Sequence, residues 1–259
     1  MAESWKNPHQ YDDVPRPVVG NANTYPPSFE VDWHSHGRGQ LVYAETGVLV
    51  LKNTYGTWVA PPERAVWTPA HTLHSLRTVG AVTTRSLLLD ADAARALGDV
   101  STVISVSPLL RQLLISASGV PVDYDMDGRD GLVMDLLVAE LGRAPRVALS
   151  VPLPASEKLL ARCQAFLEAP NIHDAINDWA DALGLDRRTF TRTFRRQTGL
   201  SFGAWRQQAC LLTALPRLAG GESVTAIAMD LGYDSPAAFS TMFRRLLGVP
   251  PSRYAERPA

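Results

Sequence analysis

Five arginines stand within ten residues in the last third of this 259-residue chain: Arg187, Arg188, Arg192, Arg195 and Arg196. A guanidinium group holds its donors in a fixed fork that pairs with phosphate oxygens or, through two hydrogen bonds, with the edge of guanine. Most runs of charge are simply the solvated face of a helix. Whether these arginines bind a nucleic acid depends on the elements that position them.

A repeat surrounds the arginines. The pattern of residues 180–186 returns 48 positions later at 228–234, and that of residues 190–196 returns 49 positions later at 239–245. Each copy predicts a short apolar helix, a turn that contains glycine, and a second helix that carries arginine. This is the helix-turn-helix pattern, whose second helix enters the major groove of DNA. A chain with two such units is most simply a DNA-binding protein.

In the first unit, Phe190 and Phe194 lie four residues apart and are predicted to face the core. Asp186 is expected to cap the helix, because its side chain can accept hydrogen bonds from the amides of the first turn. The outer face, which we expect to contact DNA, carries Arg187, Arg188, Thr191, Arg192 and Arg195. The first four are the candidates for reading bases, since residues near the start of a recognition helix usually reach base edges.

The second unit has a less polar outer face. Its second helix is expected to begin after the cap Ser235 and to turn Phe239 and Phe243 inward. The residues predicted to contact DNA are Pro236, Ala237, Ser240, Thr241 and Arg244. We expect them to read bases weakly or to bind mainly the backbone. Residues 202–218 should form a connecting helix that Pro216 kinks or ends.

The second unit closely resembles the DNA-binding domain of the AraC/XylS family of transcription regulators. The strongest match is residues 232–240, Gly-Tyr-Asp-Ser-Pro-Ala-Ala-Phe-Ser, followed by residues 243–245, Phe-Arg-Arg, and residues 248–254, Gly-Val-Pro-Pro-Ser-Arg-Tyr. The resemblance covers about residues 160–257. It implies a domain of seven helices that carries both helix-turn-helix units.

The N-terminal half has a different texture. Short β-rich runs across residues 29–89 alternate with hairpin signals, which predicts a sandwich or a small barrel. Within about residues 25–90 the two motifs of the cupin jelly roll, the usual sensor domain of the resembled family, are matched by the spacing of His34, His36, Gln40, Gly47, Pro69 and His74. An apolar pocket with a few polar groups would suit a small organic effector. The residues expected to line it are Trp33, His34, His36, Gln40, Tyr43, Trp67 and His74.

The cupin resemblance also implies a metal site at His34, His36, Gln40 and His74. Metal-binding cupins have glutamate where this chain has Gln40, which brings no negative charge. Three imidazoles can still hold a divalent transition metal, and the alternative is a polar rim whose histidines only form hydrogen bonds. No cofactor is certain on this ground. We expect the three histidines to converge in one pocket in either case.

Two leucine stripes, at residues 109–114 and 132–141, predict helices that follow the barrel. They either cover it or form the dimer interface that the resembled family often has at this position. Three prolines mark residues 145–158 as a linker, between a sensor domain at 1–144 and a DNA-binding domain at 159–259. The expected fold class is α+β: a jelly-roll β-barrel with flanking helices, then an all-α domain with two helix-turn-helix units.

The composition, 46% hydrophobic and 20% charged, is that of a soluble globular protein. No apolar run approaches the ~18–20 residues of a membrane helix and no signal peptide opens the chain, so we expect a cytoplasmic protein without a membrane partner. Cys163 and Cys210 form no close-spaced motif and are predicted to be buried thiols. The net charge is −4 over residues 1–159 and +3 over residues 160–259, so the positive part carries the repeat.

The sequence therefore predicts a transcription regulator and not an enzyme. Its expected partners are promoter DNA, a small-molecule effector, a second copy bound through the N-terminal half and, if it activates, RNA polymerase. The alternative is a cupin metalloenzyme or a metal-ion sensor that uses His34, His36 and His74. The enzyme is disfavoured because the carboxylate ligand is absent and no clear acid or base pairs with the histidines.

Overall fold

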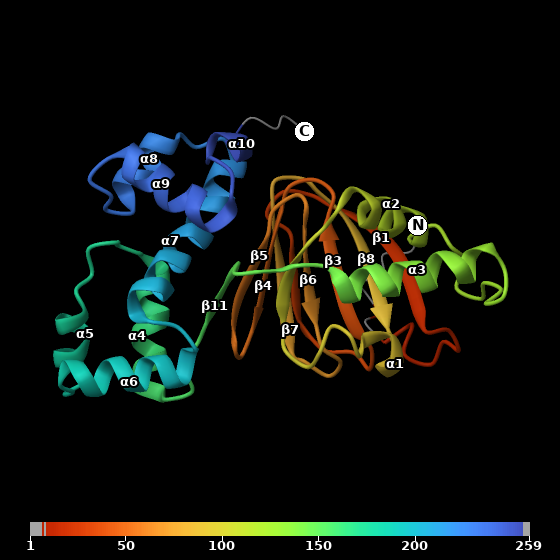
Figure 1. Ribbon diagram of the computed structural model, residues 1–259, viewed down its shortest axis with the longest axis horizontal. Coiled ribbons are helices and arrows are strands. Elements are labelled where there is room, and N and C mark those ends of the chain that lie inside the picture. The colour runs from red at the N-terminus through yellow and green to blue at the C-terminus, as the bar shows by residue number, and fades with distance from the viewer. Residues whose placement is uncertain (1–6, 8, 256–259) are drawn as a thin grey trace. The chain divides into compact units, whose positions relative to one another are not determined.

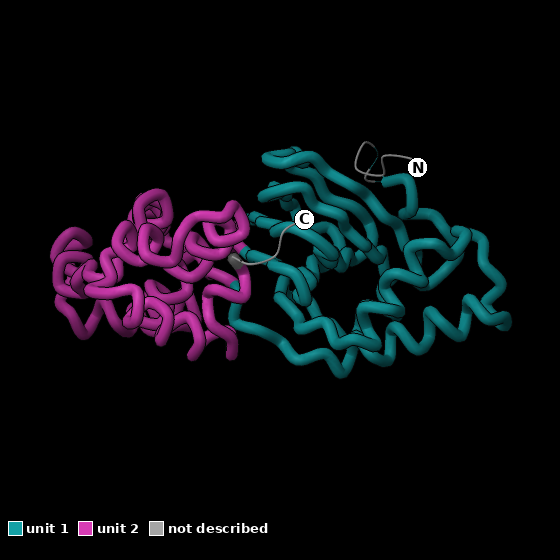
Figure 2. The backbone as a smooth tube through the Cα atoms, turned by 90° about the horizontal axis from the view of Figure 1, so that it is seen from above, with its two compact units in different colours: residues 1–53, 58–149, 259 teal, residues 54–57, 150–258 magenta. Residues whose placement is uncertain are grey.

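The computed structural model describes residue 7 and residues 9–255 of the chain. These residues fall into two compact units (Figure 2). The first contains the residues up to 53 and 58–149, and the second contains 54–57 and the residues from 150 onward. None of the helices in the described residues is long and apolar enough to cross a lipid bilayer.

The first unit is a barrel of two antiparallel sheets (Figures 1 and 2). Its strands are β1 (Val18–Tyr25), β2 (Glu30–His34), β3 (Gly39–Ala44), β4 (Val48–Asn53), β5 (Gly56–Ala60), β6 (Arg64–Thr68), β7 (His74–Val79), β8 (Val82–Leu89), β9 (Thr102–Ser105) and β10 (Arg146–Val147). One sheet has the order β1-β8-β3-β6-β9-β10, and β5, β4, β7 and β2 are consecutive in the other. Paired strands run antiparallel.

Three helices complete the first unit: α1 (Ala91–Ala94), α2 (Pro108–Ala117) and α3 (Arg129–Arg143). α2 begins as the sequence predicts, with Pro108 in its first turn and the Ser107 hydroxyl accepting from the Leu110 amide at 3.1 Å. Buried leucines of α2 and α3 pack in one core with the apolar side chains of β1, β3, β6 and β8. α2 lies so close to β1 that a Cβ at Gly20 would stand 2.1 Å from the Ala117 carbonyl oxygen. The helices therefore cover the outer face of the first sheet, and the barrel keeps its inner face for other side chains.

In the described residues the second unit contains the seven helices that the resemblance implies. They are α4 (Glu157–Glu168), α5 (Ile176–Ala182), α6 (Arg187–Thr198), α7 (Phe202–Ala219), α8 (Val224–Asp230), α9 (Pro236–Leu247) and α10 (Ser252–Ala255), and they follow a short strand, β11 (Ser150–Pro152). Trp179, Trp205 and Phe194 form the centre of an aromatic cluster that joins α5, α6 and α7. α7 runs between this cluster and the helix pair α8–α9 (Figure 1). The α+β class, with a barrel followed by a helical domain, is confirmed.

The structure adds detail to two local expectations. α7 does not end at Pro216 but continues to Ala219, because a proline in the last turn removes only one helical amide and the helix itself ends soon after it. Within the predicted linker, residues 146–147 pair with β9 and residues 150–152 form β11. At the end of β11 the Pro152 carbonyl accepts from the Trp205 indole at 2.8 Å, so this part of the segment is bonded to α7. Cys163 and Cys210 are buried free thiols, as predicted.

Candidate functional site

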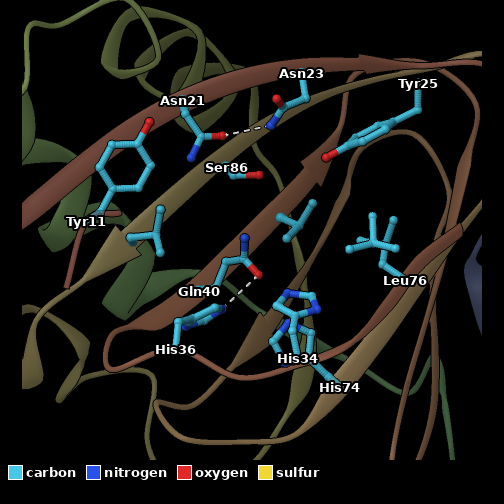
Figure 3. Close-up of a pocket in the computed structure, with 13 residues that line it drawn as sticks. Tyr11, Asn21, Asn23, Tyr25, His34, His36, Gln40, His74, Leu76 and Ser86 are labelled. Atoms are coloured by element: carbon cyan, nitrogen blue, oxygen red, sulfur yellow. Dashed lines mark hydrogen bonds between the residues drawn. The ribbon is translucent and has the colours of Figure 1, made fainter. Parts of the chain in front are cut away.

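A small cavity of about 50 Å³ lies inside the barrel (Figure 3). The side chains that line it are Tyr11, Asn21, Asn23, Tyr25, Val31, His34, His36, Gln40, Val42, His74, Leu76, Ser86 and Leu88. Successive strand residues point to opposite faces of a sheet. On β3, Gln40 and Val42 therefore reach the cavity, whereas Leu41 and Tyr43 enter the core under the helices. None of the described residues in this lining is an aspartate, glutamate, lysine or arginine.

Three histidines meet at one end of the cavity (Figure 3). His34 at the end of β2 pairs in register with His74 at the start of β7, and His36 stands in the following loop. The ring centroids of His34 and His74 are 4.3 Å apart, and those of His36 and His74 are 5.2 Å apart. One ring nitrogen from each residue lies within 4.8 Å of the other two. The predicted convergence of these histidines is confirmed.

The hydrogen bonds of the three rings fix which nitrogen carries the proton. Nδ1 of His34 lies 2.8 Å from the Asp32 carbonyl, Nδ1 of His36 lies 2.6 Å from the Arg38 carbonyl, and Nδ1 of His74 lies 2.7 Å from the Thr72 carbonyl. A carbonyl oxygen can only accept, so each Nδ1 carries a proton, and in a neutral ring the lone pair is then left on Nε2. This is the arrangement that orients histidines which bind metals through Nε2.

Hydrogen-bond donors are scarce at the Nε2 atoms of the two buried rings, His36 and His74. Nε2 of His74 is buried, and no described residue donates a hydrogen bond to it. Nε2 of His36 lies 3.3 Å from Oε1 of Gln40, which is itself an acceptor unless the amide is turned. A buried acceptor without a donor costs free energy. A cation placed among the three nitrogens would remove that cost.

Burial keeps two of the rings neutral. Desolvation lowers the pKa of His74 to about 3 and also lowers the pKa of His36 from its ordinary value of 6.5. Both imidazoles are therefore uncharged at neutral pH, which is the form that binds metals. The hydrogen bonds of Nδ1 oppose these shifts but do not cancel them.

The three aromatic residues predicted to line the pocket lie elsewhere. Tyr43 and Trp67 are in the core between the first sheet and the helices, where the Trp67 indole donates to the Gly98 carbonyl at 2.8 Å. Trp33 is 53% exposed on β2. The side on which a strand residue lies depends on register, which the aromatic character of a residue does not reveal.

Polar residues of β1 line the cavity in place of those aromatic side chains. Asn21, Asn23 and Tyr25 occupy alternate positions, and the amide of Asn23 donates to the side chain of Asn21 at 3.1 Å. They were not predicted, because the barrel was expected to begin at about residue 25. Their period of two is a signal that could have identified them.

The segment before β1 also reaches the cavity, through Tyr11. It is held against the loop that carries His36. The carboxylate of Asp12 accepts from the Gly37 amide at 3.0 Å, and the buried guanidinium of Arg38 donates to the Arg16 carbonyl at 2.8 Å. These contacts fix Tyr11 beside the polar residues of β1 (Figure 3).

In the second unit, α6 has the exposed polar face that its sequence predicts. Asp186 caps it by accepting from the amides of Arg188 and Thr189 at 2.9 and 3.0 Å. Phe190 and Phe194 are buried. The predicted DNA-contacting side chains are all exposed: Arg187, Arg188, Thr191, Arg192 and Arg195.

α9 is built in the same way. Ser235 caps it by accepting from the Ala238 amide at 3.1 Å, and Phe239 and Phe243 are buried. Ala237, Thr241 and Arg244 are exposed, whereas Pro236 and Ser240 are half-buried. The face is short of long polar side chains, as the sequence indicates.

Comparisons with known proteins agree with this division of the chain. A family described as the AraC-like ligand binding domain matches residues 22–123, and the helix-turn-helix domain family matches residues 179–257. The chain is 30% identical to the HTH-type transcriptional regulator NimR of Escherichia coli over 224 residues, which cover 86% of this chain and 82% of NimR. It is 30% identical to the HTH-type transcriptional regulator RipA of Corynebacterium glutamicum over 129 residues, 49% of this chain and 37% of RipA.

Two solved structures are also similar. ToxT from Vibrio cholerae, bound to (E)-4-(8-methylnaphthalen-1-yl)but-3-enoic acid, is 11% identical with a TM-score of 0.39, and the match covers 93% of this chain and 98% of ToxT. The DNA-binding domain of AdpA in complex with a target DNA is 33% identical with a TM-score of 0.36, over 39% of this chain and 91% of that domain.

Acid should weaken the folding of the metal-free first unit. His74, with a pKa of about 3 in the fold, regains a pKa near 6.5 on unfolding, and the pKa of His36 shifts in the same direction. The unfolded chain therefore binds more protons below about pH 6.5. The free energy of unfolding is undiminished above that pH. It falls as the pH drops towards 3, by up to about 1.4 kcal/mol per pH unit from His74, and His36 adds a loss of the same sign.

Urea titrations of the protein at pH 7, 6 and 5 measure this loss. His74→Gln removes one of the two titrating rings and should flatten the dependence on pH. An identical dependence in His74→Gln and the unchanged protein would show that this ring is not buried neutral.

Proposed function

Because this chain belongs to the AraC family of transcription regulators, we propose that α6 and α9 bind adjacent major grooves of promoter DNA and that the barrel binds an effector. The observation that carries the first part is the repeated, capped helix with a buried phenylalanine pair and an exposed polar face. Centres of adjacent major grooves lie about 34 Å apart on one side of the duplex. If the regulator activates transcription, RNA polymerase is a further partner.

The two recognition helices differ in what they can read. The four base-reading candidates of α6 include three arginines, which can form paired hydrogen bonds with guanine. α9 offers Ala237 and Thr241, whose small side chains suit thymine methyl groups, and Arg244 further along for phosphate. We infer that α6 supplies most of the sequence specificity and α9 mainly fixes register.

Replacing Arg192 with alanine should weaken binding to a specific site, obtained by selection from random DNA duplexes, by roughly 1–3 kcal/mol if its guanidinium pairs with guanine. Binding to unrelated DNA should change much less, since the change removes a base contact. Titration of both DNAs at the same salt concentration measures the ratio of specific to non-specific affinity. Glu168→Ala, on the exposed face of α4, is the control and should leave both affinities unchanged. Equal losses of affinity for the two DNAs would show that Arg192 contacts the phosphate backbone of DNA instead of a base.

A second proposal concerns the barrel. The three inward Nε2 atoms, one of them without a donor, fit a divalent transition metal, and His34, His36 and His74 would be its ligands. The metal would act as a Lewis acid with open positions for water or an effector. Gln40 would stand beside it as a neutral group, so the site would keep the full positive charge of the ion. This favours a metal-dependent sensor over an enzyme, because the lining supplies no carboxylate for acid–base chemistry.

Protein loaded with Zn²⁺ and then dialysed should retain about one ion per chain, measured by elemental analysis, if three imidazoles hold it. His36→Ala should lower the retained metal sharply. His173→Ala is the control, because His173 is exposed and lies in the second unit outside the cluster, and it should retain as much metal as the unchanged chain. Equal retention in both variants, or none in the unchanged protein, would exclude the site.

We also propose that two copies associate through α3. Leu132 and Leu136, one helical turn apart on its outer face, are 67% and 46% exposed. Leu109 on the neighbouring α2 is 50% exposed, and α2 packs against α3. Gathered apolar side chains of this kind mark association surfaces. Helices that cover the barrel on one side can meet a second copy on the other.

The double change of Leu132 and Leu136 to glutamate should convert a dimer into a monomer, because four like charges would meet across the interface. Light scattering of the full chain at about 10 μM, an ordinary concentration for dimers of moderate affinity, reports the mass. Val100→Glu adds a charge at a position that is 70% exposed and outside α3, and it should stay dimeric. An unchanged protein that is already monomeric would remove this interface.

A further inference from the structure

The turns of the two helix-turn-helix units differ in one respect. Gly184 and Gly232 hold the same place in the two copies, and both have a left-handed backbone, with φ of 65° and 78°. A Cβ at Gly184 would meet nothing within 4 Å, whereas a Cβ at Gly232 would lie 2.4 Å from Oδ1 of Asn171. The turn of the second helix-turn-helix unit is therefore covered by a side chain from the loop between α4 and α5. The turn of the first helix-turn-helix unit is open.

That loop is bonded to the turn it covers. The amide of Ile172 donates to the carbonyl of Leu231, at the end of α8, over 2.8 Å. Asn171 is held in position because its Oδ1 accepts from the His173 amide at 2.8 Å. The His173 ring lies 3.2 Å from the Asp234 carboxylate, but both side chains are well exposed, so this pair adds little. The backbone bond and the packing of Asn171 are the substantial contacts.

The other end of the loop is attached to the first helix-turn-helix unit and to α7, the helix that connects the two helix-turn-helix units. The carboxylate of Asp174 accepts from the indole of Trp179, a fully buried residue of α5, at 3.0 Å. The carbonyl of Asp174 accepts from the guanidinium of Arg206 on α7. Four consecutive residues thus contact α5, α7 and the turn between α8 and α9.

We propose that residues 171–174 form a brace that fixes the second helix-turn-helix unit relative to the first, so that the protein accepts one spacing between its two DNA half-sites. α7 is the covalent connection between the units (Figure 1), and its last turn contains Pro216 and is followed by Gly220 and Gly221. An end of this kind resists bending poorly. The brace adds a second attachment at the turn from which α9 starts.

The inference rests on the proposed binding of DNA by both units. One inserted base pair rotates the second half-site by about a tenth of a turn, since a turn holds about 10–10.5 base pairs. A braced pair of helices cannot follow that rotation, whereas a pair joined by α7 alone can bend towards it. Asn171, Ile172 and Gly232 are on this view positioning residues, which set where α9 lies without themselves reading a base.

Selection from a pool of random DNA duplexes tests the brace with the full chain and does not require the operator to be identified first. The unchanged protein should enrich two half-sites at one spacing. Gly232→Ala, which drives a methyl group into Asn171, and Asn171→Ala, which removes the acceptor for the His173 amide, should broaden the spacing or lose the second half-site. Gly184→Ala imposes the same backbone strain in the open turn and should keep the original spacing. Asn171→Asp retains the acceptor for the His173 amide and should keep the original spacing.

The loss of affinity is measured by comparing two duplexes, one with the selected spacing and one with a single inserted base pair between the half-sites. The insertion should cost the unchanged protein at least about fivefold in affinity, comparable to the loss of one base contact, and should cost Asn171→Ala clearly less. If Gly232→Ala does not fold by circular dichroism, Asn171→Ala decides, since Asn171 is exposed. Several spacings for the unchanged protein, or the original single spacing in Asn171→Ala, would overturn the brace. Enrichment of no sequence at all would overturn the binding of DNA, and the brace with it.

Discussion

Periodicity is the constraint on which both units depend. In the barrel, the period of two along β3 sends Gln40 and Val42 to the cavity and Leu41 and Tyr43 to the core beneath the helices. In the helical unit, the period of 3.6 buries Phe190 and Phe194 and thereby leaves the arginines of α6 in solvent. Each functional surface is the side of an element that packing does not use.

The same constraint explains how much the sequence could predict. A helix needs only its own residues to define its faces, so the buried phenylalanines, the caps Asp186 and Ser235 and the exposed arginines followed directly from spacing. A strand has two faces that can both be covered, as in the first sheet. Tyr43 and Trp67 were assigned to the wrong one because the register that decides between core and cavity comes from neighbouring strands. Asn21 and Asn23 were missed because the barrel was expected to begin at about residue 25, whereas β1 already pairs with β8 from Val18 onward.

The histidine cluster shows how local backbone bonds can prepare a site before anything binds. Each Nδ1 proton is committed to a carbonyl two residues away, so the ring cannot turn without losing that bond. The sequence indicates that the three rings should meet but does not reveal their tautomers. That information depends on the backbone conformation at Asp32, Arg38 and Thr72, which only the fold defines.

The size of the cavity has a consequence for affinity. At about 50 Å³ it has room for an ion and a few water molecules, whereas pockets that enclose organic ligands usually measure about 300–1,000 Å³. An organic effector too large for this space would therefore need a wider conformation of the barrel. Its apparent dissociation constant is the intrinsic one divided by the population of that conformation. A form present at about one part in a hundred would make binding look about a hundredfold weaker than the contacts in the complex imply.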